Sequence, residues 1–152
     1  RFMARIWAEG HEKYIGDLVH DDATVFGLEE QPLHGTDDIL RFRRMAHAQF
    51  SDFSFQTINA VESGDSIAVA GIVRASDLQT GRRGGARLHM LMQLRDGRIG
   101  MANILIDYLG FFESMGRLPP RILDQCLLGH LAPGCRRPER VQCRCRPAHG
   151  GR

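Results

Sequence analysis

The dipeptide Asp96-Gly97 is the feature that most constrains how this chain folds. It interrupts a long β-patterned run that extends over residues 86–106. A two-residue type I′ turn requires positive φ at both of its central positions, and Asp-Gly adopts that conformation readily. The sequence therefore predicts an antiparallel β-hairpin in which Asp96 and Gly97 form the loop.

The register of this hairpin follows from the turn. With Asp96 and Gly97 in the loop, opposed residue numbers sum to 193, so Arg95 faces Arg98 and Ala86 faces Asp107. Because side chains alternate along a strand, one face of the hairpin collects a defined set of residues. That set includes Leu88, Met90, Met92, Met101, Asn103, Leu105 and Asp107. The face is predicted to be apolar except for Asn103 and Asp107, which makes these two residues candidates for chemistry.

The remaining periodicity predicts an α+β protein. Helical stretches are expected at residues 2–8 and 11–19, with a short strand at 23–28 and a third helix from residue 36. Further strands are expected at residues 53–61 and 65–75, ahead of the hairpin, and a short helix at residues 108–115 closes the pattern. This order, with helices first and antiparallel strands later, favours α+β over α/β.

The composition changes near Pro120. Residues 121–152 contain seven Arg and two acidic residues, which gives this segment a net charge of +5. Because the whole chain has a net charge of +2, the body of the chain, residues 1–120, has a net charge of −3. All four cysteines lie in it: Cys126, Cys135, Cys143 and Cys145. The Cys143-x-Cys145 spacing is not that of ordinary zinc knuckles, so we expect no metal site. We predict one domain over residues 1–120 and a disordered basic tail, rich in Cys, Arg and Pro, over residues 121–152.

Composition also bears on partners and location. The body of the chain is acidic and has no aromatic residues interleaved with a basic patch, so we expect no nucleic-acid partner. Its apolar runs fall far short of the roughly 20 residues that a membrane-spanning helix needs, so we expect no membrane partner. Nothing in the composition indicates export, and we expect a cytoplasmic protein. The chain opens with Arg1 rather than Met, which leaves a removed signal peptide open.

Several motifs appear in an order that resembles a known family. The segments are "DLVHDDATVFG", "LHGTDDILRF", "LMQLRDGRIG" and "LIDYLGFFESMGRLPP". Together they resemble the SnoaL-like polyketide cyclases, within the superfamily of ketosteroid isomerase and nuclear transport factor proteins, over nearly all of residues 3–120. The resemblance implies a cone-shaped barrel, in which a curved antiparallel sheet packs against three N-terminal helices. It also implies a homodimer formed through the outer face of the sheet.

The same resemblance implies an activity. It is an intramolecular aldol-type cyclisation, or an isomerisation, of a small hydrophobic carbonyl substrate, with no metal and no organic cofactor. Asp107 stands where the cyclases of this family carry their acid/base aspartate, and a positioned carboxylate suffices for such proton transfers. From the residues alone, the N-cap of the helix that begins at Tyr108 is the favoured interpretation of Asp107, and the resemblance raises the catalytic interpretation beside it.

Each of the other candidate site residues has both a possible functional role and a possible structural role. The resemblance pairs a histidine with the aspartate, yet the predicted register puts His89 on the opposite face, unless a β-bulge near Ala86 reverses it. Asn103 is predicted to donate to a substrate oxygen or to hydrogen-bond within the sheet. The other residues expected to line the pocket, each also readable as core or surface, are Met90, Met92, Met101, Trp7, Tyr14 and His34.

Two hypotheses of different class follow. The first is a small-molecule enzyme with Asp107 as its acid/base group. The second is a non-catalytic module that binds a small molecule or a partner, because one fold hosts many functions. A capping role for Asp107, with its carboxylate in solvent, would count against the first hypothesis.

Overall fold

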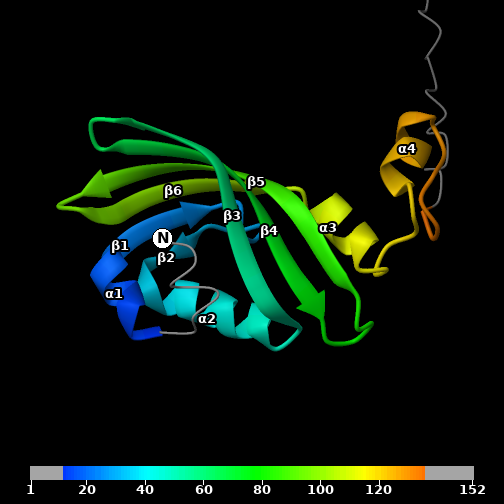
Figure 1. The fold of residues 1–152 in the computed structure, drawn as a ribbon, viewed down its shortest axis with the longest axis horizontal. Helices are drawn as coiled ribbons and strands as arrows, with labels where there is room; N and C mark the ends of the chain where they lie inside the picture. The colour runs from blue at the N-terminus through cyan, green and yellow to red at the C-terminus, as the bar shows by residue number, and fades with distance from the viewer. Residues whose placement is uncertain (1–11, 136–152) are drawn as a thin grey trace, which may run out of the picture. The chain divides into compact units, whose positions relative to one another are not determined.

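The computed structural model describes residues 12–135 of the chain. The chain divides into two compact units, Arg1–Pro120 and Arg121–Arg152. The first unit contains a curved six-stranded sheet with helices, shown in Figure 1. This arrangement confirms the predicted α+β class.

The elements of the first unit follow the predicted order. They are η2 (Glu12–Tyr14), α1 (Ile15–Leu18), β1 (Val19–Phe26), β2 (Leu33–His34), α2 (Gly35–His47), β3 (Phe50–Ser63), β4 (Ser66–Asp77), β5 (Arg83–Arg95), β6 (Arg98–Ile106) and α3 (Tyr108–Ser114). The helix expected at residues 11–19 is shorter than predicted, because the β-branched Val19 already begins β1. The helix expected at residues 2–8 lies outside the described residues.

The sheet is mixed, whereas a fully antiparallel sheet was expected. The strand order is β2-β1-β6-β5-β4-β3. Every neighbouring pair is antiparallel except β1 and β6, which run parallel. The reason is topological: after β1, the chain passes through α2 and four successive antiparallel strands, and the last of these returns beside β1 in the same direction. The parallel pairing of β1 with β6 places the loop that follows β1 next to the end of β6.

The β5–β6 turn has the predicted conformation, but the predicted register is wrong beyond it. Asp96 and Gly97 have φ of 51° and 73°, and Arg95 pairs with Arg98. The register then shifts, because Leu94 pairs with Ile99 whereas Gln93 pairs with Met101. Gly100 is the additional residue of a β-bulge, which reverses the facing of every residue that follows it in β6.

The bulge exchanges the two sets of β6 side chains between the faces of the sheet. Met90 pairs with Ile104, so Ile104 shares the face of Met90, which packs against the helices. Asn103 pairs with Leu91 and lies on the other face. We call the helix-covered face the inner face and the opposite one the outer face. Asn103 and Asp107 were expected on the inner face, and this expectation is wrong because one inserted residue reverses the parity.

Two groups of buried side chains fill the inner face. One includes Ile39 and Phe42 of α2, which is drawn beneath the sheet in Figure 1, together with Val25, Met92 and Ala102. The other gathers Phe50, Leu88, Met90, Phe111 and Met115 where α3 packs against β5. The space between these two groups is a pocket.

The second unit contains a short helix, α4 (Ile122–Leu127), although this segment was expected to be disordered. The Nε of Arg121 lies 2.9 Å from a carboxylate oxygen of Asp124 one turn later, an ion pair that favours this helical turn. The expectation for residues 136–152 concerns residues outside the description. No helix within residues 12–135 is long and apolar enough to cross a membrane.

Candidate ligand pocket

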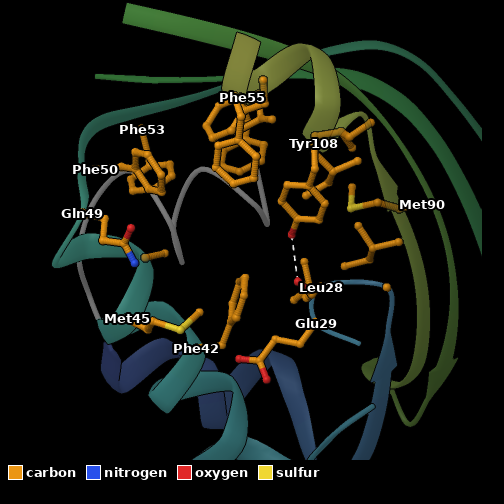
Figure 2. Close-up of a pocket in the computed structure, with 18 of the residues that line it drawn as sticks. Leu28, Glu29, Phe42, Met45, Gln49, Phe50, Phe53, Phe55, Met90 and Tyr108 are labelled. Atoms are coloured by element: carbon orange, nitrogen blue, oxygen red, sulfur yellow. Dashed lines mark hydrogen bonds between the residues drawn. The ribbon is translucent and has the colours of Figure 1, made fainter. Parts of the chain in front are cut away.

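A cavity of about 570 Å³ opens between α2, α3 and the inner face of the sheet. Figure 2 shows its lining side chains directed toward a common open centre. Six phenylalanines form much of the wall: Phe42, Phe50, Phe53, Phe55, Phe111 and Phe112. A cavity of this size, with few polar groups in its wall, is typical of sites that hold small hydrophobic molecules.

A second β-bulge assembles the aromatic wall. Phe53 and Phe55 lie two residues apart in β3 and share a face, whereas strict alternation would turn Phe50 away from them. The register of β3 shifts between Ser51 and Ser54, and Asp52 has a positive φ of 53°. The rings of Phe50 and Phe53 consequently lie 6.4 Å apart in an edge-on arrangement. The extra residue places all three phenylalanines in one wall.

Glu29 is an acidic group at the pocket wall, in the connection between β1 and β2. A Cβ at Gly27, whose φ is 87°, would overlap the carbonyl oxygen of Ile104, so only glycine lets this connection approach β6 so closely. The two Glu29 carboxylate oxygens lie 3.1 and 3.2 Å from the two terminal nitrogens of Arg41. This bidentate pair fixes the orientation of the carboxylate.

Tyr108 supplies a hydroxyl group to the same region. The hydroxyl donates to the Leu28 carbonyl at 2.9 Å, and the ring stacks on Phe112 with 6.0 Å between centroids. Burial raises the pKa of Tyr108 to about 12, and the negative charge of Glu29 makes a smaller contribution in the same direction. The phenol therefore stays protonated near neutral pH and serves as a hydrogen-bond donor.

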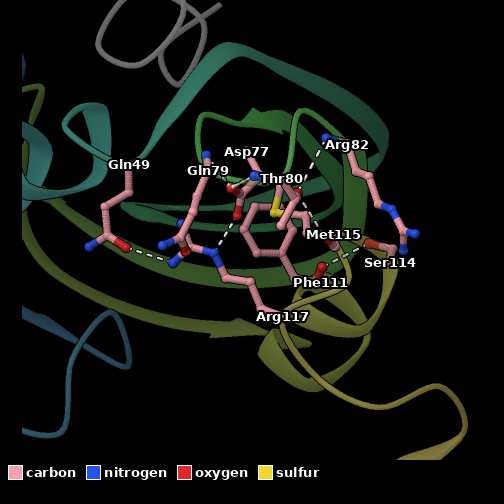
Figure 3. Close-up of polar contacts among 9 residues, drawn as sticks. All are labelled: Gln49, Asp77, Gln79, Thr80, Arg82, Phe111, Ser114, Met115 and Arg117. Carbon is pink, nitrogen blue, oxygen red and sulfur yellow. Dashed lines mark hydrogen bonds and ion pairs between the residues drawn. The ribbon is translucent and has the colours of Figure 1, made fainter.

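Gln49, in the turn between α2 and β3, is a further polar residue of the wall. Its Oε1 accepts from Nη1 of Arg117 at 2.6 Å, and Arg117 in turn donates from Nε to Asp77 (Figure 3). The hydrogen bond from Arg117 holds the pKa of Asp77 below its ordinary value, despite the opposing effect of burial. Gln49 is thus joined to a buried carboxylate through one arginine.

The predicted catalytic pair lies outside this pocket. Asp107 is exposed and caps α3, where its Oδ1 accepts from the Gly110 N–H at 2.9 Å. His89 lies on the outer face of the sheet, where it pairs with Leu105. The expected pocket placement of Asp107 is therefore wrong, and this exposed capping position counts against Asp107 as the acid/base group.

The predicted lining residues divide between several environments. Met90 lines the pocket, whereas Met92 is buried in the neighbouring core. Asn103 lies with His89 in a hollow of about 520 Å³ on the outer face. Met101 also points outward, because it follows the bulge. The homodimer expected through this outer face stays a prediction.

Tyr14 and His34 are not among the residues that line the pocket. Tyr14 lies in η2, and His34 is exposed in β2, where its N–H donates to Asp38 at 2.9 Å. Trp7 lies outside the described residues. Within residues 12–135, no three His, Cys, Asp or Glu side chains gather as metal ligands would.

Sequence reasoning missed Glu29, Gln49 and Tyr108. Glu29 and Gln49 stand in connections between elements, where hydrophobic periodicity gives no signal. Tyr108 directly follows Asp107, but the incorrect register placed Asp107, and not Tyr108, on the inner face. Gly27, a glycine at the end of a predicted strand, was the one available sign that backbone approaches backbone here.

Comparison with known proteins gives a consistent result. The family model described as the SnoaL-like domain matches residues 1–100. A search of curated protein sequences found no match. Similar folds occur among solved structures, and because the three described below share less than 20% sequence identity with this chain, the likeness concerns the fold.

Three of these structures show that proteins with this fold differ in their described functions. IdmH from Streptomyces antibioticus, a proposed polyketide cyclase, is 18% identical with a TM-score of 0.67, covering 75% of this chain and 93% of IdmH. A Catenulispora acidiphila protein with a ketosteroid isomerase-like fold, in complex with trimethylamine, is 14% identical with a TM-score of 0.69, covering 75% and 88%. An epoxide hydrolase of M. tuberculosis is 12% identical with a TM-score of 0.62, covering 84% and 90%.

Proposed function

This chain belongs to the SnoaL-like domain family, and from that premise we propose that its pocket binds a small hydrophobic carbonyl compound and catalyses a metal-free acid/base reaction on it. The reaction class is intramolecular aldol-type cyclisation or isomerisation. The observation that carries the proposal is the pocket of about 570 Å³, whose apolar wall is interrupted by Glu29 and Tyr108.

Glu29 and Tyr108 offer complementary groups for this chemistry. The Glu29 carboxylate would take a proton from a carbon next to a carbonyl group, and the electrons of the broken C–H bond would move onto the carbonyl oxygen. The Tyr108 hydroxyl, turned from Leu28 to that oxygen, would stabilise the enolate by a hydrogen bond. Arg41 keeps Glu29 oriented throughout.

The second half of the reaction returns the proton. In an isomerisation, protonated Glu29 delivers it to another carbon of the extended enolate. In a cyclisation, the enolate carbon forms a bond to a second carbonyl carbon of the same molecule, and the new alkoxide takes the proton from Glu29. Both routes restore the carboxylate and require no further reactant.

A non-catalytic binding module is the alternative, and one observation favours it. Both polar groups already have partners: Glu29 is held by Arg41 at two points, and the Tyr108 hydroxyl is engaged with Leu28. In a binding module, Glu29 and Tyr108 would serve only as structural parts of the pocket wall, and the bound molecule would be released unchanged.

Glu29→Gln, assayed with small β-keto esters and a β,γ-unsaturated ketosteroid, distinguishes these functions. For an enzyme we expect turnover to fall at least about a hundredfold, because the base is lost, with binding retained. Glu62→Gln is the matched control, since Glu62 is exposed in β3 and is not among the residues that line the pocket. Binding without turnover in the unaltered protein would support the binding module, and absence of binding to every probe would refute both.

A further inference from the structure

The main chain of Gln49 is fixed on both sides. Its N–H donates to the Ala46 carbonyl at 3.1 Å, and its carbonyl accepts from the Leu78 N–H at 2.9 Å. The first bond closes the end of α2, and the second ties the turn to the segment that follows β4. The side chain of Gln49 therefore extends into the pocket wall from a constrained position.

Arg117 determines which way round the Gln49 amide lies. A guanidinium group only donates hydrogen bonds, so the amide must present its oxygen to Arg117. The distance from Nη1 of Arg117 to Oε1 of Gln49 is 2.6 Å. The amide NH₂ is consequently on the other side, and Figure 2 shows the nitrogen turned toward the open centre of the pocket. Within residues 12–135, no group accepts a hydrogen bond from this nitrogen.

Arg117 is itself held in place. Its Nε donates to Oδ2 of Asp77, and its guanidinium lies over the Phe50 ring, 4.6 Å from the centroid. The Asp77 side chain has no exposed surface. Its other oxygen, Oδ1, accepts from the N–H groups of Gln79 and Thr80 at 2.7 and 2.9 Å. With both oxygens engaged, Asp77 anchors Arg117 in one orientation (Figure 3).

The pocket thus has donors on two sides. Tyr108 and Gln49 project from different elements toward the same open centre in Figure 2, with the apolar wall between them. Glu29 and Glu30 also line the pocket, and their charge disfavours an anionic ligand. The complementary molecule is uncharged and carries an acceptor oxygen at each end of an apolar body.

We propose that Gln49 determines ligand specificity by donating a hydrogen bond to a second acceptor oxygen of the bound molecule, with Arg117 and Asp77 as positioning residues that hold its amide in the donating orientation. This inference rests on the proposed binding of carbonyl compounds. It adds that the preferred substrate is a dicarbonyl compound whose two oxygens are separated by an apolar segment.

Matched ligands test the proposal. Para-diacetylbenzene and diacetylbiphenyl each carry two ketones, at different separations, and replacing one acetyl group by ethyl removes a single oxygen. We expect the unaltered protein to bind the diketone of suitable length about tenfold more tightly than its ethyl analogue, as one hydrogen bond predicts. Titration calorimetry measures this preference.

Gln49→Glu is the informative variant, because a carboxylate still accepts from Arg117 but no longer donates. We expect it to abolish the preference for the diketone while leaving affinity for the ethyl analogue unchanged. Gln56→Glu is the matched control: Oε1 of Gln56 accepts from Arg74 at 3.1 Å in a second Gln–Arg pair, away from the pocket. Gln49→Leu repeats the test without adding a charge.

Arg117→Lys tests the positioning role, since a lysine cannot serve Asp77 and Gln49 in the same fixed geometry. We expect the diketone preference to fall about threefold, with ethyl-analogue binding unchanged, which general destabilisation would not produce. A preference that survives Gln49→Glu or Gln49→Leu, or that is missing from the unaltered protein, overturns the role of Gln49 while leaving the pocket proposal standing. If no probe binds, the proposed function fails and this inference fails with it.

Discussion

The inner and outer faces of the β5–β6 hairpin differ sharply, although both carry large apolar residues. Leu88 and Met90 on the inner face are 2% and 5% exposed, whereas Leu91 and Leu105 on the outer face are 46% and 71% exposed. The residue types alone do not separate these environments. The side on which each residue lies depends on strand parity, and in β6 the parity depends on one inserted residue.

Two parts of the same hairpin show where that parity changes. From the turn to the pair Leu94 and Ile99, the register is the one that a type I′ turn dictates. Past Gly100 the pairing shifts by one residue. The turn therefore determines the pairs next to it, and the packing of the partly buried Ile104 and Ile106 on the inner face determines the remaining pairs.

Deleting Gly100 should have the largest effect, because it removes the bulge and returns β6 to the register set by the turn. Ile104 and Ile106 would leave the inner face and Asn103 would enter it. We expect the free energy of unfolding to fall by at least about 4 kcal/mol, measured by urea denaturation.

Gly100→Ala is the control for this deletion. A Cβ at residue 100 would lie 3.6 Å from the Cβ of Arg95, an ordinary contact, and so the bulge is retained. We expect a change of about 0.5 kcal/mol or less, since the number of residues matters here and not the glycine itself. A deletion variant as stable as the unaltered protein would contradict the role given to the bulge.

Truncating one leucine on each face should give the next largest effect. Leu88→Ala removes a fully buried side chain and leaves a cavity, so we expect a loss of about 3 kcal/mol. Leu105→Ala should cost about 0.5 kcal/mol or less, because its side chain is mostly exposed. Both values come from the same denaturation experiment, and equal losses would show that the two faces are not distinguished as described.

Replacing Asp107 should lower the stability less than truncating Leu88. Asp107→Ala removes the cap of α3 and is expected to cost about 1 kcal/mol, whereas Asp107→Asn keeps an acceptor for the Gly110 N–H and should be near neutral. We expect turnover, where the Glu29 experiment detects any, to be unchanged in Asp107→Asn. A large loss of turnover in that variant with unchanged stability would restore the acid/base role first predicted for Asp107.

The sequence predicted the fold more fully than the site. The turn at Asp96-Gly97, the order of helices and strands, and the SnoaL-like family were each evident from local pattern. Among the predicted lining residues that the structure describes, Met90 alone lines the pocket. Glu29, Gln49 and Tyr108 were not predicted, because each is brought to the wall by contacts with segments distant in the chain.

By itself, the sequence determined the turn conformation, the α+β class and the family, since these depend on local propensity and on the order of motifs. Only the tertiary structure decided which residues of β6 face inward, that β1 runs parallel to β6, and which polar groups meet in the pocket. The physical reason is that β-strand side chains alternate with a period of two: a single bulged residue has almost no local signature, yet it exchanges the faces of the strand. Packing against the helices then selects the exchange that partly buries Ile104 and Ile106 and leaves Asp107 to cap α3.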